Sequence, residues 1–263
     1  MTITRLGSTG VLVALLAAQT TTQSPVRRNF VACPIVQDTK TVPCWVSDYE
    51  GERYYLGIQT DISAEFHPPY LGHKALVEGV VSDEPRICGG IVLKPVRVSP
   101  LPEQDGSCNT ILPAVDQFTV PFAPRPPGPS GGRLAFQAAG PPQTPAARSK
   151  PAIEPREFEI LYDFDMPVMG RHAGVLSQIV RFADDIGAKR VVITATRGST
   201  LLSDGQVMTE NTGIAEARAK ELKDLLKGGG LRAVIDVAPP SQADRADGID
   251  DWRSRQATVR VEP

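Results

Sequence analysis

Few residues of this chain have the types and spacings that catalysis requires. The three histidines, His67, His73 and His172, stand far apart, and none is accompanied by an evident nucleophile. The sequence contains no Gly-x-Ser-x-Gly turn, no His-Glu-x-x-His zinc motif and no phosphate-binding P-loop. Cys88 is a nominal nucleophile, but in an oxidising compartment it is better explained as half of a disulfide. We therefore expect a binding protein that has no catalytic residues, no cofactor and no metal ion.

The cysteines of the chain all lie in its first half: Cys33, Cys44, Cys88 and Cys108. An even number of cysteines in an exported chain predicts two disulfides, and three pairings are open. The alternative is a metal site made from these thiols together with His67 or His73. No two of the cysteines form the Cys-x-x-Cys pair that is typical of such sites, so the disulfides are favoured.

The charges of the chain are nearly balanced. Lys and Arg together number 28 and Asp and Glu number 30, and the two signs alternate along the sequence. A protein that binds nucleic acid usually carries a basic excess that is gathered on one face. The charge pattern therefore predicts no nucleic-acid partner.

Residues 1–24 have the pattern of a signal peptide. A single arginine precedes a short apolar run over residues 11–18, and small polar residues follow it. A membrane-spanning helix needs about 20 apolar residues, whereas the apolar part of a signal peptide needs only about 7 to 15. We expect export to the periplasm, cleavage between Ala18 and Ser24, and no membrane span in the mature chain. The first cysteine, Cys33, lies far beyond the apolar run, which argues against a lipoprotein.

Composition divides the mature chain into two domains and a linker. Residues 118–155 form a Pro-rich segment with little apolar periodicity, which predicts an extended spacer. Residues 30–117 contain short runs of β-branched and aromatic residues that Gly and Pro interrupt, which predicts a small β-rich domain, a sandwich or a barrel. The stretch 71–99 is similar to one half of an OB-type barrel.

Residues 156–263 alternate between strand and helix patterns. The strand patterns cover residues 158–165, 189–195, 231–237 and 256–262. Apolar residues recur at helical spacing over 167–187 and 210–230, and each helix pattern ends in glycine. The order β-α-β-α-β-β predicts a two-layer α/β sandwich, with helices on one face of a mixed sheet. For the whole chain we expect the α+β class.

Four segments of this second domain occur in the order and near the spacing of one family. They are "YDFD" (162–165), "VVITATRG" (191–198), "NTGIAEARAKEL" (211–222) and "SRQATVRV" (254–261). The third is similar to the family's Asn-x-x-Leu-Ser-x-x-Arg-Ala helix start, and the last to its closing Asn-Arg-Arg strand, of which it keeps the first arginine. Residues 158–263 thereby resemble the OmpA-like C-terminal domain, which associates with peptidoglycan.

The resemblance implies a ligand and the residues that would bind it. In that family the ligand is the diaminopimelate of the peptidoglycan stem peptide, which presents a carboxylate and an ammonium. The family's helix arginine, which binds the carboxylate through two parallel hydrogen bonds, matches Arg218 here. The helix-opening asparagine matches Asn211, whose side chain is also suited to an N-cap. Arg255 matches the closing arginine and would help bind the stem carboxylate, or else would pair with Asp250 or Asp251 on the surface.

The acid that binds the ammonium in the family is missing. Gly198 stands at its position, and the interval from Gly198 to Arg218 is longer than the family usually shows. Asp204, in the extra stretch, is one candidate replacement and Glu210 is another. The alternative is a degenerate domain that has lost peptidoglycan binding and keeps the fold for protein contacts.

Two functions follow from these observations. The first is a non-catalytic periplasmic protein, associated with the cell wall or outer membrane, that binds peptidoglycan and presents its N-terminal domain to another envelope protein. The second is a protein-interaction adaptor whose wall-binding fold no longer binds the wall.

Overall fold

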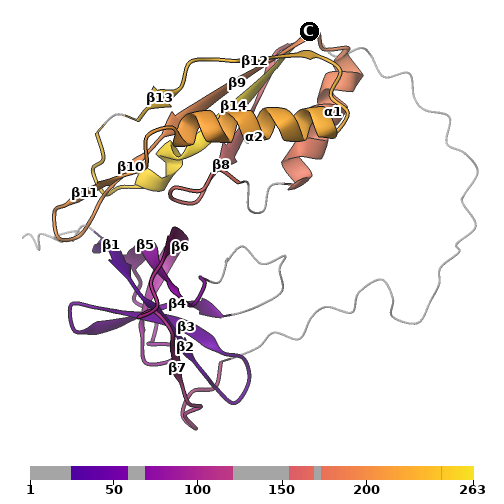
Figure 1. Cartoon of the computed structure of the whole chain (residues 1–263). Helices are drawn as coiled ribbons and strands as arrows, with labels where there is room; N and C mark the ends of the chain where they lie inside the picture. The colour runs from indigo at the N-terminus through magenta and orange to yellow at the C-terminus, as the bar shows by residue number, and fades with distance from the viewer. Residues whose placement is uncertain (1–24, 59–68, 121–153, 169–172, 244) are drawn as a thin grey trace, which may run out of the picture.

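The computed structural model describes residues 25–58, 69–120, 154–168, 173–243 and 245–263. They form two units, each with its own sheet and its own buried cluster (Figure 1). We call residues 25–120 the β unit and residues 154–263 the α/β unit. The predicted signal peptide, most of the predicted linker, His67 and His172 lie outside the described residues. No helix in the described ranges is long and apolar enough to cross a membrane.

The β unit is a seven-stranded sheet. Its strands, in chain order, are β1 (Arg27–Ala32), β2 (Pro34–Gln37), β3 (Cys44–Tyr49), β4 (Glu52–Ile58), β5 (His73–Val81), β6 (Ile91–Gln104) and β7 (Thr110–Leu112). In space they follow the order β1-β5-β6-β4-β3-β2-β7. Glu50 and Gly51 both have positive φ angles, as the tight turn of the β3–β4 hairpin requires.

The sheet folds back on itself around aromatic side chains. The ring of Phe30 on β1 stacks on Tyr49 of β3, with 4.6 Å between centroids, and lies 5.1 Å from the ring of Tyr54 on β4. The long strand β6 makes this possible, because it pairs with β4 near Ile91 and with β5 from Leu93 onward. The β unit therefore buries an apolar cluster around these rings, and a second buried cluster includes Cys44, Val46 and Cys88.

Two disulfides tie the β unit together, as the cysteine count predicts. They join Cys33 to Cys108 and Cys44 to Cys88, which selects one of the three open pairings. The bonds close loops with sequence separations of 75 and 44 residues, and chain-entropy reasoning gives each about 4 kcal/mol of stabilisation. All four thiols are consumed, so none is left as a metal ligand.

The α/β unit contains the six predicted elements and a few additions. The six are β8 (Arg156–Leu161), α1 (Ala173–Ile186), β9 (Arg190–Arg197), α2 (Ile214–Gly228), β12 (Val234–Val237) and β14 (Gln256–Glu262). The additions are β10 (Ser199–Leu201), β11 (Val207–Thr209), β13 (Ser241–Gln242) and the 3₁₀ helix η1 (Asp251–Ser254). The α+β class expected for the chain is confirmed.

The main sheet of the α/β unit has the order β12-β9-β14-β8 and is mixed. β12 runs parallel to β9, whereas β14 is antiparallel to both β9 and β8. Alternate residues of β9 and β14 are buried, so only one face of the sheet is covered. Both helices contribute to the same apolar cluster and lie on that face (Figure 1).

Candidate functional site

The predicted carboxylate-binding arginine, Arg218, is a fully buried residue of α2. A guanidinium has five N–H donors, and here all five have an acceptor inside the α/β unit. Nε donates to the Met166 carbonyl (3.1 Å), Nη1 to the Thr196 carbonyl (3.0 Å) and to Glu210 (2.9 Å), and Nη2 to the Asp163 carbonyl (3.2 Å) and to Glu210. Arg218 therefore has no donor left for a ligand in this conformation.

Glu210 is the anionic partner of Arg218 and is itself fully buried. Its carboxylate also accepts from the backbone N–H groups of Gly198 (2.7 Å) and Asp165 (2.9 Å). The pair thus joins the end of β9, the loop after β8 and the start of α2. From the sequence, Glu210 was only the second of two candidates to replace the missing acid.

Asp204, the other candidate acid, is not the partner of Arg218. It lies in the exposed turn between β10 and β11, where its carboxylate accepts from the N–H of Gln206 (2.9 Å). The extra stretch that contains Asp204 forms this β10–β11 hairpin, which we call the inserted hairpin. Its antiparallel pairing holds Asp204 at the tip, which explains why Asp204 cannot replace the family's acid.

Gly198, at the position of the missing acid, has no room for any side chain. A Cβ built there would lie 2.5 Å from Cγ of Arg255 and 2.6 Å from Oγ of Ser254. Its own N–H is bound to Glu210. Close packing of the chain around residue 198 therefore excludes an aspartate at this position.

The expectation that Asn211 caps α2 with its side chain is wrong. The helix begins at Ile214, and the N-cap is Gly213, which has a φ angle of 92° and makes no side-chain cap. The side chain of Asn211 donates instead to Asp165 (3.0 Å), which also accepts the Asn211 backbone N–H. Burial raises the pKa of Asp165, and the Asn211 backbone hydrogen bond partly opposes that rise.

Arg255, the second predicted binding residue, reaches across to the β unit. It is fully buried, and both of its Nη atoms donate to the carboxylate of Glu78 on β5. Nη1 also donates to the hydroxyl of Thr200 (2.9 Å), which in turn donates to Glu78 (3.0 Å). The expected alternative, a surface pair with Asp250 or Asp251, is wrong because the side chain of Arg255 is buried and pairs with Glu78.

A second set of bonds joins the inserted hairpin to β1. The backbone N–H of Asn29 donates to Oγ of Ser203 (2.9 Å), and the N–H of Ser203 donates to the Asn29 carbonyl (2.7 Å). The side-chain amide of Asn29 donates to the carbonyls of Leu201 (3.1 Å) and Gly248 (3.0 Å). Figure 1 shows the hairpin extending from the α/β unit toward β1. Sequence reasoning missed Asn29 and Glu78. Each is a polar residue within a largely apolar strand pattern, and this could have indicated a buried polar contact.

Arg97 on β6 makes a further contact between the units. Its guanidinium lies 4.8 Å from the ring centroid of Trp252 and 3.8 Å from Asp163. Burial lowers the pKa of Arg97, and the nearby Asp163 opposes that change. We call the contacts of Glu78, Asn29 and Arg97 with the α/β unit the joint.

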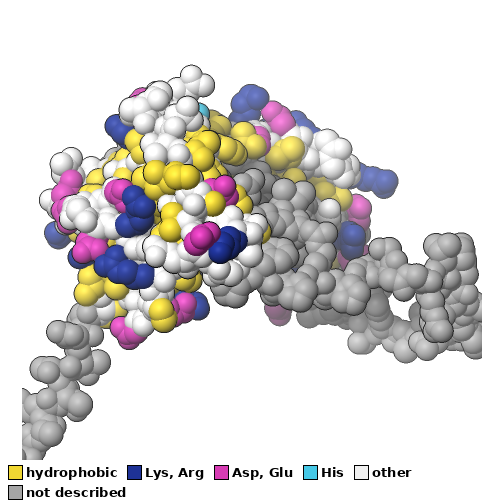
Figure 2. All heavy atoms as spheres, turned by 90° about the horizontal axis from the view of Figure 1, so that it is seen from below, with side chains coloured by type: hydrophobic (Ala, Val, Ile, Leu, Met, Phe, Trp, Pro, Cys, Tyr) yellow, Lys and Arg dark blue, Asp and Glu magenta, His cyan; other side chains and the backbone are white. Residues whose placement is uncertain are grey.

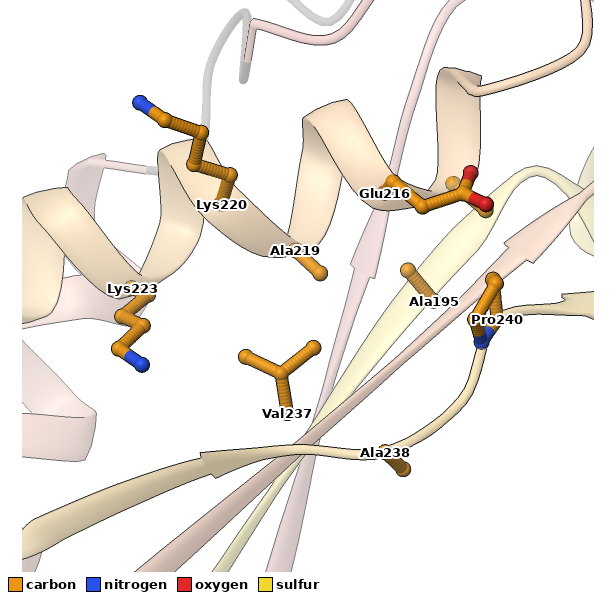
Figure 3. A pocket seen from close by; sticks show the side chains of 9 residues that line it. Ala195, Glu216, Ala219, Lys220, Lys223, Val237, Ala238 and Pro240 are labelled. Carbon is orange, nitrogen blue, oxygen red and sulfur yellow. The ribbon is translucent and has the colours of Figure 1, made fainter.

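Away from the joint, a cavity of about 230 Å³ lies between α2 and the chain that follows β12 (Figure 3). Its walls are largely apolar, with Ala195, Ala219 and Val237 among the lining side chains. Lys220 and Lys223 extend from α2 beside it, and Lys220 is paired with Asp224 (3.0 Å). None of the predicted binding residues lines this cavity.

Charges of both signs are interspersed on the face of the molecule shown in Figure 2. The mixture agrees with the near balance of charge in the sequence. Among the described residues, no group of three His, Cys, Asp or Glu side chains is arranged to hold a metal ion.

No protein-family model and no curated protein matches the chain. Among solved structures, it is similar to a MotB-like protein from Desulfovibrio vulgaris, at 12% identity and a TM-score of 0.33, over 41% of this chain and 75% of that one. It is also similar to the OmpA-like domain of FopA1 from Francisella tularensis subsp. tularensis SCHU S4, at 15% identity and a TM-score of 0.31, over 41% of this chain and 73% of that one. At such values neither likeness bears on function.

Proposed function

We propose that this chain is an exported cell-envelope protein that acts through protein contacts, and that its α/β unit is a non-catalytic OmpA-like module. One observation carries the proposal: both arginines that the family pattern assigns to the ligand are fully buried on carboxylates of this chain. Its two disulfides are typical of an oxidising compartment such as the periplasm. The β unit then serves as the surface offered to another envelope protein.

Charge burial argues against ligand binding by Arg218. A stem-peptide carboxylate would have to displace Glu210, which would leave a buried carboxylate without its cation at a cost of about 3–5 kcal/mol. The new pair would recover no more than the old one supplied. The exchange of carboxylates at Arg218 therefore gains nothing for a ligand, and the adaptor function is preferred to the wall tether.

Peptidoglycan binding is the second candidate, and one observation favours it. Arg255 already holds a carboxylate that comes from a distant part of the chain, so its position suits an anionic ligand. A stem peptide would reach Arg255 only after Glu78 had left.

Sedimentation with purified peptidoglycan sacculi distinguishes the two candidates. We expect the mature wild-type chain to stay in the supernatant, with bovine serum albumin and a well-characterised wall-binding domain as negative and positive controls. Saturable sedimentation of the chain, reversed by free diaminopimelate, would establish wall binding and overturn the adaptor proposal.

Export is tested separately by mass spectrometry of the protein from cells. We expect cleavage between Ala18 and Ser24 and a mass that lacks the four cysteine hydrogens of the reduced form. An uncut chain with four free thiols would exclude the envelope location.

A further inference from the structure

We propose that Arg255 and Thr200 form a carboxylate-binding site of the α/β unit, and that Glu78 of the β unit occupies it as an internal ligand. We call Arg255 together with Thr200 the seat. Its occupant, Glu78, is 177 residues away from Arg255 in sequence. A partner that carries a carboxylate would then compete with the β unit for the seat. This inference goes beyond the proposed function and does not depend on wall binding.

The seat is a built site rather than an accidental contact. Arg255 is fully buried, and its ring neighbour Phe164 lies 5.6 Å from the guanidinium. The backbone N–H of Arg255 donates to the Trp252 carbonyl (3.2 Å), and its carbonyl accepts from the N–H of Tyr162 (2.8 Å). The arginine is therefore held in place from both sides by the α/β unit itself.

Glu78 offers the seat a complete carboxylate. Both of its oxygens bind the two Nη atoms of Arg255, and one of them also accepts from the Thr200 hydroxyl. A bidentate arginine–carboxylate pair of this kind is specific for a planar anion. The way in which Glu78 binds therefore indicates that the seat is suited to ligands that carry a carboxylate.

The seat retains unused binding capacity. The Nε atom of Arg255 is buried and has no acceptor among the described residues, in contrast to the fully satisfied Arg218. Buried donors without acceptors are uncommon in folded proteins and disfavour the state that contains them. An occupant with a further acceptor can bind more completely than Glu78 does, which makes exchange possible.

The charges around the seat also favour an anion. Arg97 lies opposite Glu78 in the β5–β6 register, so the β unit brings a second cation next to Arg255. Asp163, which faces Arg97, supplies the other negative charge. With the units docked and only the Glu78 carboxylate removed, Arg255 and Arg97 would face Asp163, and the net positive charge would attract a small carboxylate.

Chemical rescue tests this inference in the full mature chain. Glu78→Ala removes the carboxylate and leaves a space of about the size of acetate next to Arg255. We expect hydrogen exchange at the amides of Asn29 and Ser203, which bind across the joint, to accelerate by about tenfold or more. Added sodium acetate should restore most of the protection, whereas acetamide and sodium chloride at the same concentrations should not.

Two matched variants keep the test decisive. Glu78→Gln keeps the volume of the side chain and loses its charge, so it should loosen the joint without being rescued, because acetate has no room. Glu84→Ala removes an exposed glutamate of the same unit that pairs with Lys94, and should leave the joint unchanged. The inference is overturned if Glu78→Ala leaves both amides protected, or if acetamide rescues as well as acetate. It also fails if a folded Glu78→Ala chain does not respond to acetate.

Discussion

Two buried arginine–glutamate pairs in this protein look alike and differ in what they join. Arg218 and Glu210 are 8 residues apart, lie within one unit and leave no donor of the arginine unused. Arg255 and Glu78 are 177 residues apart, lie in different units and leave one buried donor without an acceptor. The comparison indicates that the first pair is part of the fold of the α/β unit, and the second is a contact between surfaces.

The largest effect is expected from Arg218→Ala. The variant leaves Glu210 buried without a cation, which should lower the free energy of unfolding of the α/β unit by about 3–5 kcal/mol. Urea denaturation followed by far-UV circular dichroism measures this. A residue that only binds an external ligand could be replaced with little effect on the fold, so a wild-type unfolding curve would restore Arg218 as a ligand residue.

A double variant sharpens this prediction. Arg218→Met combined with Glu210→Leu removes both charges, and should recover part of the loss because no unpaired charge stays buried. If the double variant is less stable than either single variant, the pair has a role other than charge compensation.

Glu78→Gln should have a smaller and different effect. The joint can open and let Arg255 reach water, so we expect a cost of about 1–3 kcal/mol that appears as separation of the units rather than unfolding. The far-UV spectrum should stay unchanged, while the fluorescence of Trp252 should shift toward that of a hydrated tryptophan as Arg97 leaves its ring. Loss of secondary structure in this variant would show that the second pair is as integral as the first.

Asn29→Ala should weaken the joint by about 1–2 kcal/mol, since it removes two hydrogen bonds to backbone carbonyls. Small-angle X-ray scattering should report an increase in the radius of gyration that is less than that of Glu78→Ala. Ser107→Ala, in a turn of the β unit away from the joint, provides the control. An equal expansion in both chains would exclude a specific role for Asn29.

The smallest effects concern two carboxyls that respond oppositely to acid. Hydrogen bonds from Ser107 and Lys74 lower the pKa of Asp105 in the β unit from 3.8 to about 2. The contribution of Asp105 to the stability of the folded protein is therefore present above pH 3.8 and is lost as pH falls toward 2. Burial raises the pKa of Asp165 in the α/β unit, so its contribution is present below its unfolded pKa and is lost as pH rises through the folded value.

Asp105→Asn should therefore flatten the acid dependence of stability of the β unit between pH 3.8 and about 2. Asp165→Asn should remove the opposite slope in the α/β unit. Thermal unfolding at a series of pH values checks both. Identical pH profiles for the wild type and Asp105→Asn would contradict the assignment.

Local pattern in the sequence was sufficient to predict much of the fold. Apolar spacing predicted both α1 and α2 and placed their ends within two residues, because the period of a helix is a property of its own residues, but it began them six and four residues too early. The even number of cysteines predicted two disulfides, but their pairing required the strands to be placed. The family-like motifs also identified Arg218 and Arg255 as residues of unusual importance.

Sequence alone identified Arg218 and Arg255 as residues with a special role, and tertiary structure decided that both are buried and which carboxylates they meet. Glu210 becomes the partner of Arg218 only because the inserted hairpin returns the chain to the end of β9, and Glu78 meets Arg255 only when the two units dock. Electrostatic pairing depends on distance in space rather than along the chain, and a buried charge must be paired wherever its partner originates. A contact across 177 residues therefore leaves no local pattern from which it can be predicted.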